Sequence, residues 1–445
     1  MSTAISVATT ARNQYVPRGR NELHTIFERH FEDFCEQYDE KYAPTYGRYR
    51  LERIQQLGER FSTCGDYLQG VARIRCTNPE CGHDYFRPFS CKGFYLCPSC
   101  SRKRTILFAE QLTDEVLLKL PHRQFVFTMP KAVRPFFRHD RRLFAEVSRL
   151  IYNILRDFYQ EAASRPLLTG MVIAHQTFGD MLRWNPHFHA IVLEGGFDDE
   201  GTFFYIPFSG LQSMVEVFRR RVIKLLVQRE LLNDNFARNL LSWKHSGFSI
   251  DNSVRILDES AQESLAEYIA RPPISLKKIR YEPFKGKVLF HTKYSEYFKQ
   301  NVHLFDTLDF LAELTQHIPP KGLQLIRRYG LYASRTKGRW NEMPWVAERA
   351  PKGWRATHER DVAAEDLGYE PLSDGDEEVA VDARKRAWAR LLAKVYEVDP
   401  MVCPKCGADM KVIAVIEEPD ELKRILRHLI KIGRAPPRFD PDRLN

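Results

Sequence analysis

Three short apolar segments near the middle of the chain are typical of buried β-strands. They span residues 124–129, 170–178 and 187–193, and each begins or ends beside a proline or glycine. Residues 179–186 separate the second segment from the third and predict a hairpin, which would make these two strands antiparallel. We therefore expect a sheet that contains all three strands.

Apolar residues recur at helical spacing in several longer segments, which predicts amphipathic helices. These helices are expected at residues 21–42, 143–163, 211–232, 261–270 and 308–317. Two prolines end the fourth helix, and the basic segment 274–293 that follows predicts a second hairpin. Strands separated by helices indicate an α+β fold, in which helices pack on an antiparallel sheet.

The chain has 445 residues, which is more than one hydrophobic core usually organises, and about three domains are expected. Its composition changes along the sequence and suggests the following division. We expect a disordered arm at residues 1–20, a helical and zinc-binding domain at 21–110, a central α+β domain at 111–350, an acidic linker at 351–383 and a small CxxC module at 384–445.

Charge indicates the class of partner. The formal net charge is +9, although residues 361–382 contain nine acidic and no basic side chains. The rest of the chain has 67 basic and 49 acidic residues, and such a surface attracts polyanions, with nucleic acid the first candidate. No apolar run is long enough to cross a membrane, and residues 1–20 do not resemble a secretory signal. We therefore expect a cytoplasmic, nucleoid-associated protein whose nine cysteines are thiols or metal ligands.

Six of the cysteines occur in close pairs, which is the spacing of zinc knuckles. Cys76 and Cys81, with Cys97 and Cys100, fit one tetrahedral zinc site of four thiolates. His83 and Cys91 lie between these pairs and are spare candidates, whereas Cys64 is expected to be structural. The third pair, Cys403 and Cys406, is half of a second possible zinc site. Its partners would be His428 or cysteines of the N-terminal region, or it binds no metal.

A different kind of metal site is indicated at the start of the third strand. His187 and His189 alternate with an apolar residue, so both imidazoles point to one face while Phe188 points into a core. Two imidazoles leave room for a third ligand from the neighbouring strand, with Gln176 the first choice and Asp180 or His175 the alternatives. Two nitrogens and one oxygen, with open positions, suit Mg²⁺ or Mn²⁺ bound to a phosphate.

Tyr268 is the candidate nucleophile for such a metal-bound phosphodiester. It lies on the fourth predicted helix, directly before a basic segment. A phenol that attacks phosphorus would form a covalent phosphotyrosine, which conserves the energy of the broken bond. The basic side chains expected to contact DNA phosphates are Arg271, Lys277, Lys278, Arg280, Arg327 and Arg328.

Several of these motifs, taken in order, resemble the rolling-circle transposases of bacterial insertion sequences, which belong to the HUH superfamily of single-strand endonucleases. The matching segments lie at residues 76–100, at 176–179 leading to 186–189, and at 268–274, 317–332 and 403–407. The resemblance implies an HUH-type nuclease domain within residues 111–350 and an N-terminal zinc-binding domain. It further implies that His187 and His189 bind the catalytic metal and that Tyr268 attacks single-stranded DNA at the element ends, leaving a 5′-phosphotyrosine.

One position departs from the pattern of this family. Some members carry two tyrosines four residues apart, but the earlier position here is Ser264, so the chain resembles a single-tyrosine variant. A second subunit of a homo-oligomer, or attack by a 3′-hydroxyl, would then complete strand transfer. Two other functions remain open: a plasmid replication initiator or relaxase with the same chemistry, and a zinc-containing DNA-binding regulator without catalytic activity.

Overall fold

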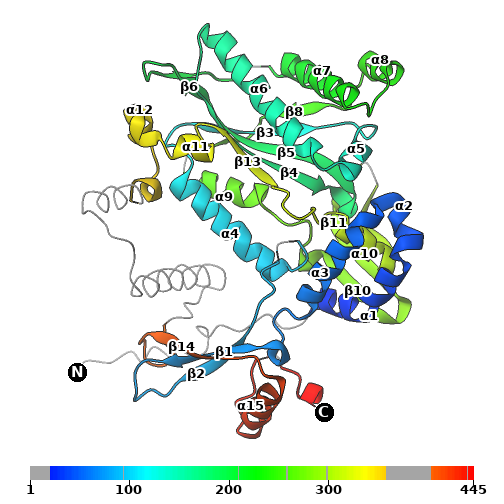
Figure 1. Ribbon diagram of the computed structural model, residues 1–445, viewed down its shortest axis with the longest axis vertical. Coiled ribbons are helices and arrows are strands. Elements are labelled where there is room, and N and C mark those ends of the chain that lie inside the picture. Colours follow the sequence, from blue (N-terminus) through cyan, green and yellow to red (C-terminus); the bar gives the residue numbers. More distant parts are fainter. Residues whose placement is uncertain are drawn as a thin grey trace, which may run out of the picture.

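A computed structural model describes residues 21–93, 95–208, 210–256, 259–296, 299–356, 402–437 and 439–444. The predicted arm at 1–20 and the acidic stretch at 361–382 lie outside these described residues. Within them, no helix is both long enough and apolar enough to cross a membrane. The α+β fold with antiparallel sheets that the sequence predicted is confirmed (Figure 1).

The largest sheet contains the three strands predicted from the apolar segments. Its order is β13 (Ile326–Gly330), β4 (Gly170–Phe178), β5 (Trp184–Leu193), β3 (His122–Thr128) and β8 (Ser249–Asp251), and β9 (Arg255–Ile256) pairs with β3. All pairs are antiparallel. The predicted hairpin between β4 and β5 is present, although β5 already begins at Trp184. A smaller ribbon pairs β6 (Gly195–Phe197) with β7 (Phe203–Tyr205).

Helices cover both faces of this central sheet (Figure 1). Phe125, Phe127 and Phe188 point to one face, where they share a core with the helices on that side. These helices are α5 (Arg134–His139), α6 (Leu143–Ala163), α7 (Gln212–Gln228) and α8 (Asp234–Ser242). On the opposite face, Val172 and Ile191 pack against the second helical layer. That layer consists of α4 (Pro98–Glu115) and α9 (Glu259–Ile269), with α11 (Ser334–Lys337) and α12 (Pro344–Ala347) beside it.

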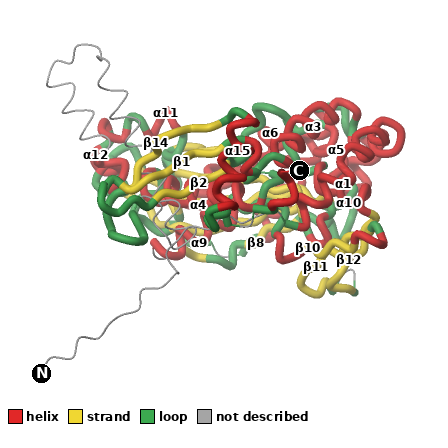
Figure 2. Tube along the Cα trace, turned by 90° about the horizontal axis from the view of Figure 1, so that it is seen from below, coloured by secondary structure: helices red, strands yellow, loops and turns green. Residues whose placement is uncertain are grey.

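A second lobe combines the N-terminal helices with a later sheet. Phe27 and Phe34 from the first helix share a core with Val288 and Phe310, which lie more than 250 positions later. Figure 2 shows α1, α3 and α10 grouped at one end of the molecule beside strands β10–β12. The elements of this lobe are α1 (Glu22–Gln37), a π-helical turn (Tyr38–Tyr42), α2 (Ala43–Tyr46), α3 (Leu51–Ser62), β10 (Ile279–Glu282), β11 (Lys287–Ser295), β12 (Gln300–Asp306) and α10 (Thr307–Thr315).

The third unit joins the β1–β2 hairpin to the C-terminal segment of the described chain. Its sheet has the order β14 (Met410–Ile416), β1 (Val71–Cys76) and β2 (Asp84–Pro88), and α15 (Pro419–Lys431) packs beside it. The sequence predicted a small CxxC module at residues 384–445, and β14 from that segment pairs along the whole length of β1. The predicted domain at 21–110 is divided, because α1–α3 pack in the second lobe and β1–β2 pack with the C-terminal segment.

Candidate active site

The hairpin of β4 and β5 gathers the predicted metal ligands on one face of the central sheet. Gln176 on β4 pairs directly with His187 on β5, and Ala174 pairs with His189. Residues that pair directly across two strands point to the same side of a sheet. Gln176, His187 and His189 therefore share the face that α9 covers, while Phe188 faces the aromatic core on the other side.

Both histidines are buried and neutral. Their ring centroids lie 4.9 Å apart, with the rings steeply inclined to each other. Burial lowers the pKa of His187 to about 4, and the positive charges of Arg271 and Arg134 act in the same direction. Burial also lowers the pKa of His189 to about 2, with further contributions from His187 and Arg271. Near neutral pH each imidazole is therefore neutral and keeps one ring nitrogen with a lone pair that can bind a metal ion.

Hydrogen bonds orient the two imidazoles. His187 donates through Nδ1 to the carbonyl oxygen of Asn185 at 2.7 Å, which leaves the lone pair on its Nε2. The Nδ1 atom of His189 lies 3.1 Å from the side-chain nitrogen of Gln124 on β3. When the side-chain amide of Gln124 is flipped by about 180°, its oxygen accepts a hydrogen bond from Nδ1 of His189. The lone pair of His189 then lies on Nε2, as it does in His187. Gln124 and Asn185 thus act on the candidate ligands from outside the predicted set.

Two of the candidate ligands have a buried atom with no hydrogen-bond partner within the described part of the chain. These atoms are Nε2 of His189 and the side-chain oxygen Oε1 of Gln176. The Gln176 amide nitrogen donates to the carbonyl oxygens of Ile269 at 3.1 Å and Tyr268 at 3.3 Å. An unpartnered buried nitrogen and oxygen on the same face fit a divalent cation with mixed imidazole and oxygen ligands.

Tyr268 lies directly above the histidines, on α9. Its ring centroid is 5.2 Å from that of His189, and the two rings are perpendicular. The side chain is 41% exposed, so the phenol is open to a large substrate. The guanidinium of Arg271 lies 4.3 Å from the centre of the phenol ring and places a positive charge beside it.

Contacts with α4 and with the sheet hold the helix that carries Tyr268. Thr105 on α4 donates its hydroxyl to the carbonyl oxygen of Ala270 at 3.1 Å, in a buried position. Arg102 forms a 2.6 Å ion pair with Glu267, and Gln176 binds the last turn of α9 from below. Three side chains from two elements, α4 and β4, thus fix the position of the candidate nucleophile.

The structure does not bring the alternative third ligands to this site. His175 points to the opposite face, where its ring stacks on Phe144 of α6 at 4.1 Å. Asp180 is exposed in the turn after β4. Strand alternation alone could have excluded His175, because neighbouring residues of a strand face opposite sides. Gln124 had no such signal, since its proximity to His189 depends on the pairing of β3 with β5.

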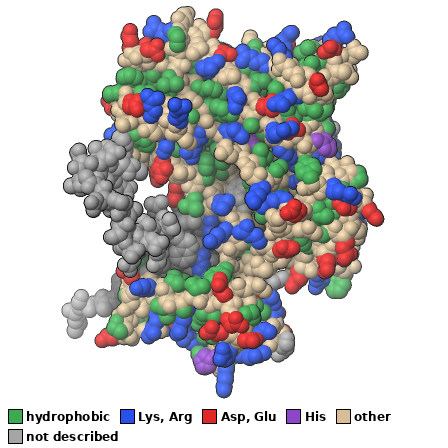
Figure 3. Space-filling view, viewed as in Figure 1, with side chains coloured by type: hydrophobic (Ala, Val, Ile, Leu, Met, Phe, Trp, Pro, Cys, Tyr) green, Lys and Arg blue, Asp and Glu red, His purple; other side chains and the backbone are tan. Residues whose placement is uncertain are grey.

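Most of the predicted DNA contacts are exposed and close to Tyr268 in sequence. Arg271, Lys277, Lys278 and Arg280 all face solvent, and Figure 3 shows lysine and arginine side chains gathered across the middle of this view. Burial lowers the pKa of Lys278, and the nearby charge of Arg271 adds to the effect. These two cations therefore lie in the same region as the tyrosine.

The remaining two predicted contacts lie on β13 and are partly buried. Arg327 pairs with Ile173 and points to the sheet face away from Tyr268. Arg328 pairs with Val172 and points to the face that carries the histidines. Of this pair, only Arg328 therefore shares a face with the candidate site.

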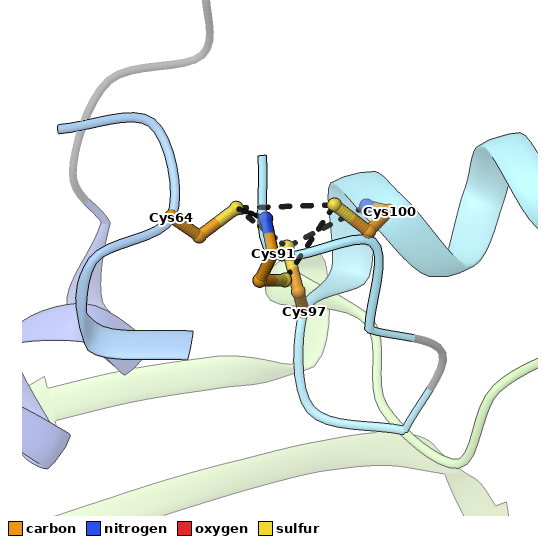
Figure 4. Close-up of side chains that lie close together, drawn as sticks. All are labelled: Cys64, Cys91, Cys97 and Cys100. Atoms are coloured by element: carbon orange, nitrogen blue, oxygen red, sulfur yellow. Dashed lines mark hydrogen bonds between the residues drawn. The ribbon is translucent and has the colours of Figure 1, made fainter. Parts of the chain in front are cut away.

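The cysteines form two groups of four sulfur atoms. Cluster I consists of Cys64, Cys91, Cys97 and Cys100, whose side chains converge in Figure 4. Cluster II consists of Cys76, Cys81, Cys403 and Cys406. Within each cluster all ligand atoms lie within 4.8 Å of one another. Four thiolates at such distances suit structural zinc, which has no open position for a substrate.

The sequence placed Cys76, Cys81, Cys97 and Cys100 in one site, and this grouping is wrong. The reason is the β1–β2 hairpin, which separates the two knuckles, while the pairing of β14 with β1 brings the C-terminal knuckle to the first one. Cys64 and Cys91, expected to be a structural thiol and a spare candidate, complete cluster I. The sequence left open which residues would complete the site of Cys403 and Cys406, and the structure places Cys76 and Cys81 of the N-terminal region beside them. Neither His83 nor His428 belongs to a cluster.

Comparison with known proteins indicates the family. Residues 170–339 match a family model described as "Putative transposase", and residues 26–129 match a model described as "Transposase zinc-binding domain". The first match contains β4, β5 and α9, and the second contains all of cluster I. No solved structure matches the chain significantly.

Two curated relatives agree with these family models. The "Transposase for insertion sequence element IS801" of Pseudomonas savastanoi pv. phaseolicola is 26% identical over 79% of this chain and 82% of its own length. The "Putative transposase y4qJ" of Sinorhizobium fredii is 24% identical over 58% of this chain and 69% of its own length. Both family models describe transposases and both relatives are named as transposases, so the chain is similar to the transposases of bacterial insertion sequences.

Proposed function

We propose that this transposase nicks single-stranded DNA at the ends of its insertion sequence and uses the hydroxyl of Tyr268 as the nucleophile. The observation that carries this proposal is the position of the tyrosine. Its ring lies 5.2 Å from His189, above a sheet face that also presents His187 and Gln176. A buried ligand set beside an exposed phenol is the arrangement that phosphodiester cleavage through a covalent intermediate requires.

The side chains of His187, His189 and Gln176 would hold a Mg²⁺ or Mn²⁺ ion. Two of them have buried atoms without hydrogen-bond partners in the described chain, which supports this assignment. When bound, the ion would polarise a phosphoryl oxygen and orient the phosphodiester. Gln124 and Asn185 would keep the imidazoles in the required orientation, as outer partners of metal ligands commonly do.

In the proposed step, the oxygen of Tyr268 attacks phosphorus and its proton passes to solvent. The bond between phosphorus and the 3′-oxygen breaks, and that oxygen takes up a proton to leave as a 3′-hydroxyl. The product is a 5′-phosphotyrosine, so the number of phosphoester bonds is unchanged. Arg271 lies over the phenol ring and would stabilise the negative charge that develops there.

The DNA strand would approach along the exposed basic segment that follows α9. Lys277, Lys278 and Arg280 present their charges to solvent in that segment, and each would neutralise backbone phosphate. Arg328 would contribute from the same face of the sheet. This reading favours single-stranded DNA, because a phenol close to a buried sheet reaches a flexible strand more easily than a stacked duplex.

A single tyrosine limits the route by which transposition is completed. Ser264 precedes Tyr268 by one helical turn and is exposed on the same helix. A serine hydroxyl there does not provide a second phenol, so the proposed rolling-circle pathway requires either a second subunit or attack by the freed 3′-hydroxyl on the phosphotyrosine. A homo-oligomer is therefore one of the two routes in the proposal.

The test is the detection of the covalent adduct. Labelled single-stranded oligonucleotides from the element ends are incubated with protein and Mn²⁺ and then separated on a denaturing gel. We expect a labelled protein band that EDTA abolishes and that Tyr268→Phe eliminates. The matched control is Tyr49→Phe, which alters another exposed tyrosine, on the second lobe, and should leave the band unchanged.

The outcome also separates the alternative functions. A DNA-binding regulator would bind the oligonucleotides and give no adduct with any variant. An undiminished adduct in Tyr268→Phe would show that another residue is the nucleophile. A plasmid replication initiator would form the same adduct, so the two enzymes are distinguished by whether the preferred oligonucleotide comes from the ends of the element. Both relatives are named as transposases, which favours the transposase over the plasmid replication initiator.

A further inference from the structure

We infer that cluster II is a second structural zinc site, assembled from residues 76–81 and residues 403–406. Cys76 ends β1 and Cys81 lies in the loop between β1 and β2, whereas Cys403 and Cys406 lie more than 300 positions later. The family match to the zinc-binding domain ends at residue 129 and therefore contains only half of these ligands. The inference concerns a metal site that is separate from the proposed nuclease chemistry.

The sulfur positions support zinc and exclude a disulfide in this conformation. The sulfur of Cys76 is 3.5 Å from that of Cys406, and the sulfur of Cys81 is 3.7 Å from that of Cys403. A tetrahedral zinc ion with bonds of about 2.3 Å to sulfur separates its ligands by about 3.8 Å. A disulfide requires a sulfur separation of only about 2.05 Å.

The backbone around the thiols has the form of two facing knuckles. The N–H of Cys81 donates to the carbonyl oxygen of Asn78, and the N–H of Gly407 donates to that of Cys403, so each pair closes a tight turn. Gly82 and Gly407 follow these pairs with φ of 59° and 74°, a conformation that glycine adopts without strain. Thr77 donates its N–H to the carbonyl oxygen of Asp409 at 2.8 Å and ties one knuckle to the other.

Strand pairing brings the knuckles together. β14 pairs with β1 in a register that sets Met410 opposite Cys76, so the residues just before β14 lie beside the loop that follows β1. The apolar contacts around the thiols are few, with Ile74 and Met410 as the main buried members. An apolar cluster of this size rarely holds two knuckles in place without a metal or a disulfide, and the packing of α15 lies in a separate cluster of the unit.

Four thiolates identify the class of ion. Soft sulfur ligands in a tetrahedral set select Zn²⁺ over Mg²⁺ or Mn²⁺, which prefer oxygen. The site therefore differs chemically from the histidine and glutamine set on the central sheet. Because the ligands come from two distant segments, zinc binding would make the β14–β1–β2 unit dependent on residues 402–444, and the unit would form only when both segments are present.

The test counts zinc in the full-length protein. The protein is purified under reducing conditions, passed through a desalting column and analysed for metal by mass spectrometry. We expect two zinc ions per chain for the unaltered protein. Cys403→Ser combined with Cys406→Ser should reduce the count to one, and so should Cys64→Ser combined with Cys91→Ser, which disrupts cluster I. Cys35→Ser is the matched control, because Cys35 belongs to neither cluster, and it should retain two.

Two results would overturn the inference. The first is a count of one zinc ion in the unaltered protein. The second is a count of two zinc ions in the variant that lacks Cys403 and Cys406. Titration of the metal-free protein with Co²⁺ provides a second measurement, in which two equivalents should give the absorption typical of tetrahedral thiolate ligation. Saturation after one equivalent would contradict the proposed site even if the serine variants fold poorly.

Discussion

Mild acid should unfold the central domain, because five of its histidines are buried in the neutral form. Burial lowers the pKa of His122 and His187 to about 4, of His175 and His317 to about 3, and of His189 to about 2. In the unfolded chain each imidazole has a pKa of about 6.5. Below that pH the unfolded state binds protons that the folded state does not, so the free energy of unfolding falls as the pH falls.

The size of the effect follows from the number of groups. Once the pH is below 6.5 and still above the folded pKa, each histidine removes about 1.4 kcal/mol of stability per pH unit. Five such groups together remove on the order of 7 kcal/mol per unit, or roughly 10 kcal/mol at pH 5. Domains of ordinary stability have a free energy of unfolding of about 5–15 kcal/mol. We therefore expect the folded domain to be lost near pH 5, well above the pKa of any of the five histidines.

The measurement is urea unfolding followed by circular dichroism at pH 7.5, 6.5, 6.0 and 5.5, without added divalent metal. His175→Met removes one of the five groups, at a position away from the candidate ligands where Nε2 has no hydrogen-bond partner among the described residues. This variant should lose about one fifth less stability between pH 7.5 and 5.5. The exposed His139 provides the control, since His139→Asn should follow the unaltered protein. A free energy of unfolding that stays constant across this range would refute the reasoning.

Further predictions concern the contacts around the tyrosine. Gln124→Leu removes the partner of His189 and should raise the Mn²⁺ concentration needed for half-maximal adduct formation by about 10–100-fold, with little change at saturating metal. An unchanged Mn²⁺ requirement would contradict the role of Gln124. Thr105→Val leaves the buried carbonyl of Ala270 without its donor and should lower the free energy of unfolding by about 1–3 kcal/mol. Arg102→Ala breaks a largely exposed ion pair and should cost less than about 1 kcal/mol, so an equal loss in both variants would contradict this ranking.

The parts of the fold with strong local patterns were predictable from the sequence. The strand at residues 170–178 and the helix at 143–163 were found with their observed bounds, because long apolar periodicity and flanking glycine or proline define them locally. The hairpin between β4 and β5 followed from the turn-forming residues between two apolar runs. These elements carry the two histidines and Gln176, so the sequence alone indicates the candidate ligands.

The long-range pairings were not predictable in the same way. α1 packs against β10 and α10, which lie more than 240 positions later in the sequence. No local sequence pattern predicts this packing. The same limit explains the cysteines. Spacing along the chain favoured grouping the nearest pairs, whereas the observed partners depend on β14 pairing with β1. A knuckle motif therefore predicts that thiols bind a metal better than it predicts which thiols share it.

Cluster I and the candidate nucleophile are connected through one helix, and this affects how metal dependence must be tested. α4 begins in the cluster, with Cys97 as its N-cap and Cys100 in its first turn, and one turn later Thr105 binds the end of α9. Zinc at cluster I would therefore help to fix the helix that carries Tyr268.

Loss of the adduct in EDTA does not by itself identify a catalytic ion, because removal of zinc from cluster I would release α4 and displace the tyrosine. The His187→Ala variant separates the two causes, because it removes one candidate ligand from β5 and leaves every cysteine in place. If this variant keeps its zinc and its affinity for DNA but forms no adduct with Mn²⁺, the histidines act in the chemistry. If it forms the adduct as the unaltered protein does, zinc in cluster I alone accounts for the effect of EDTA.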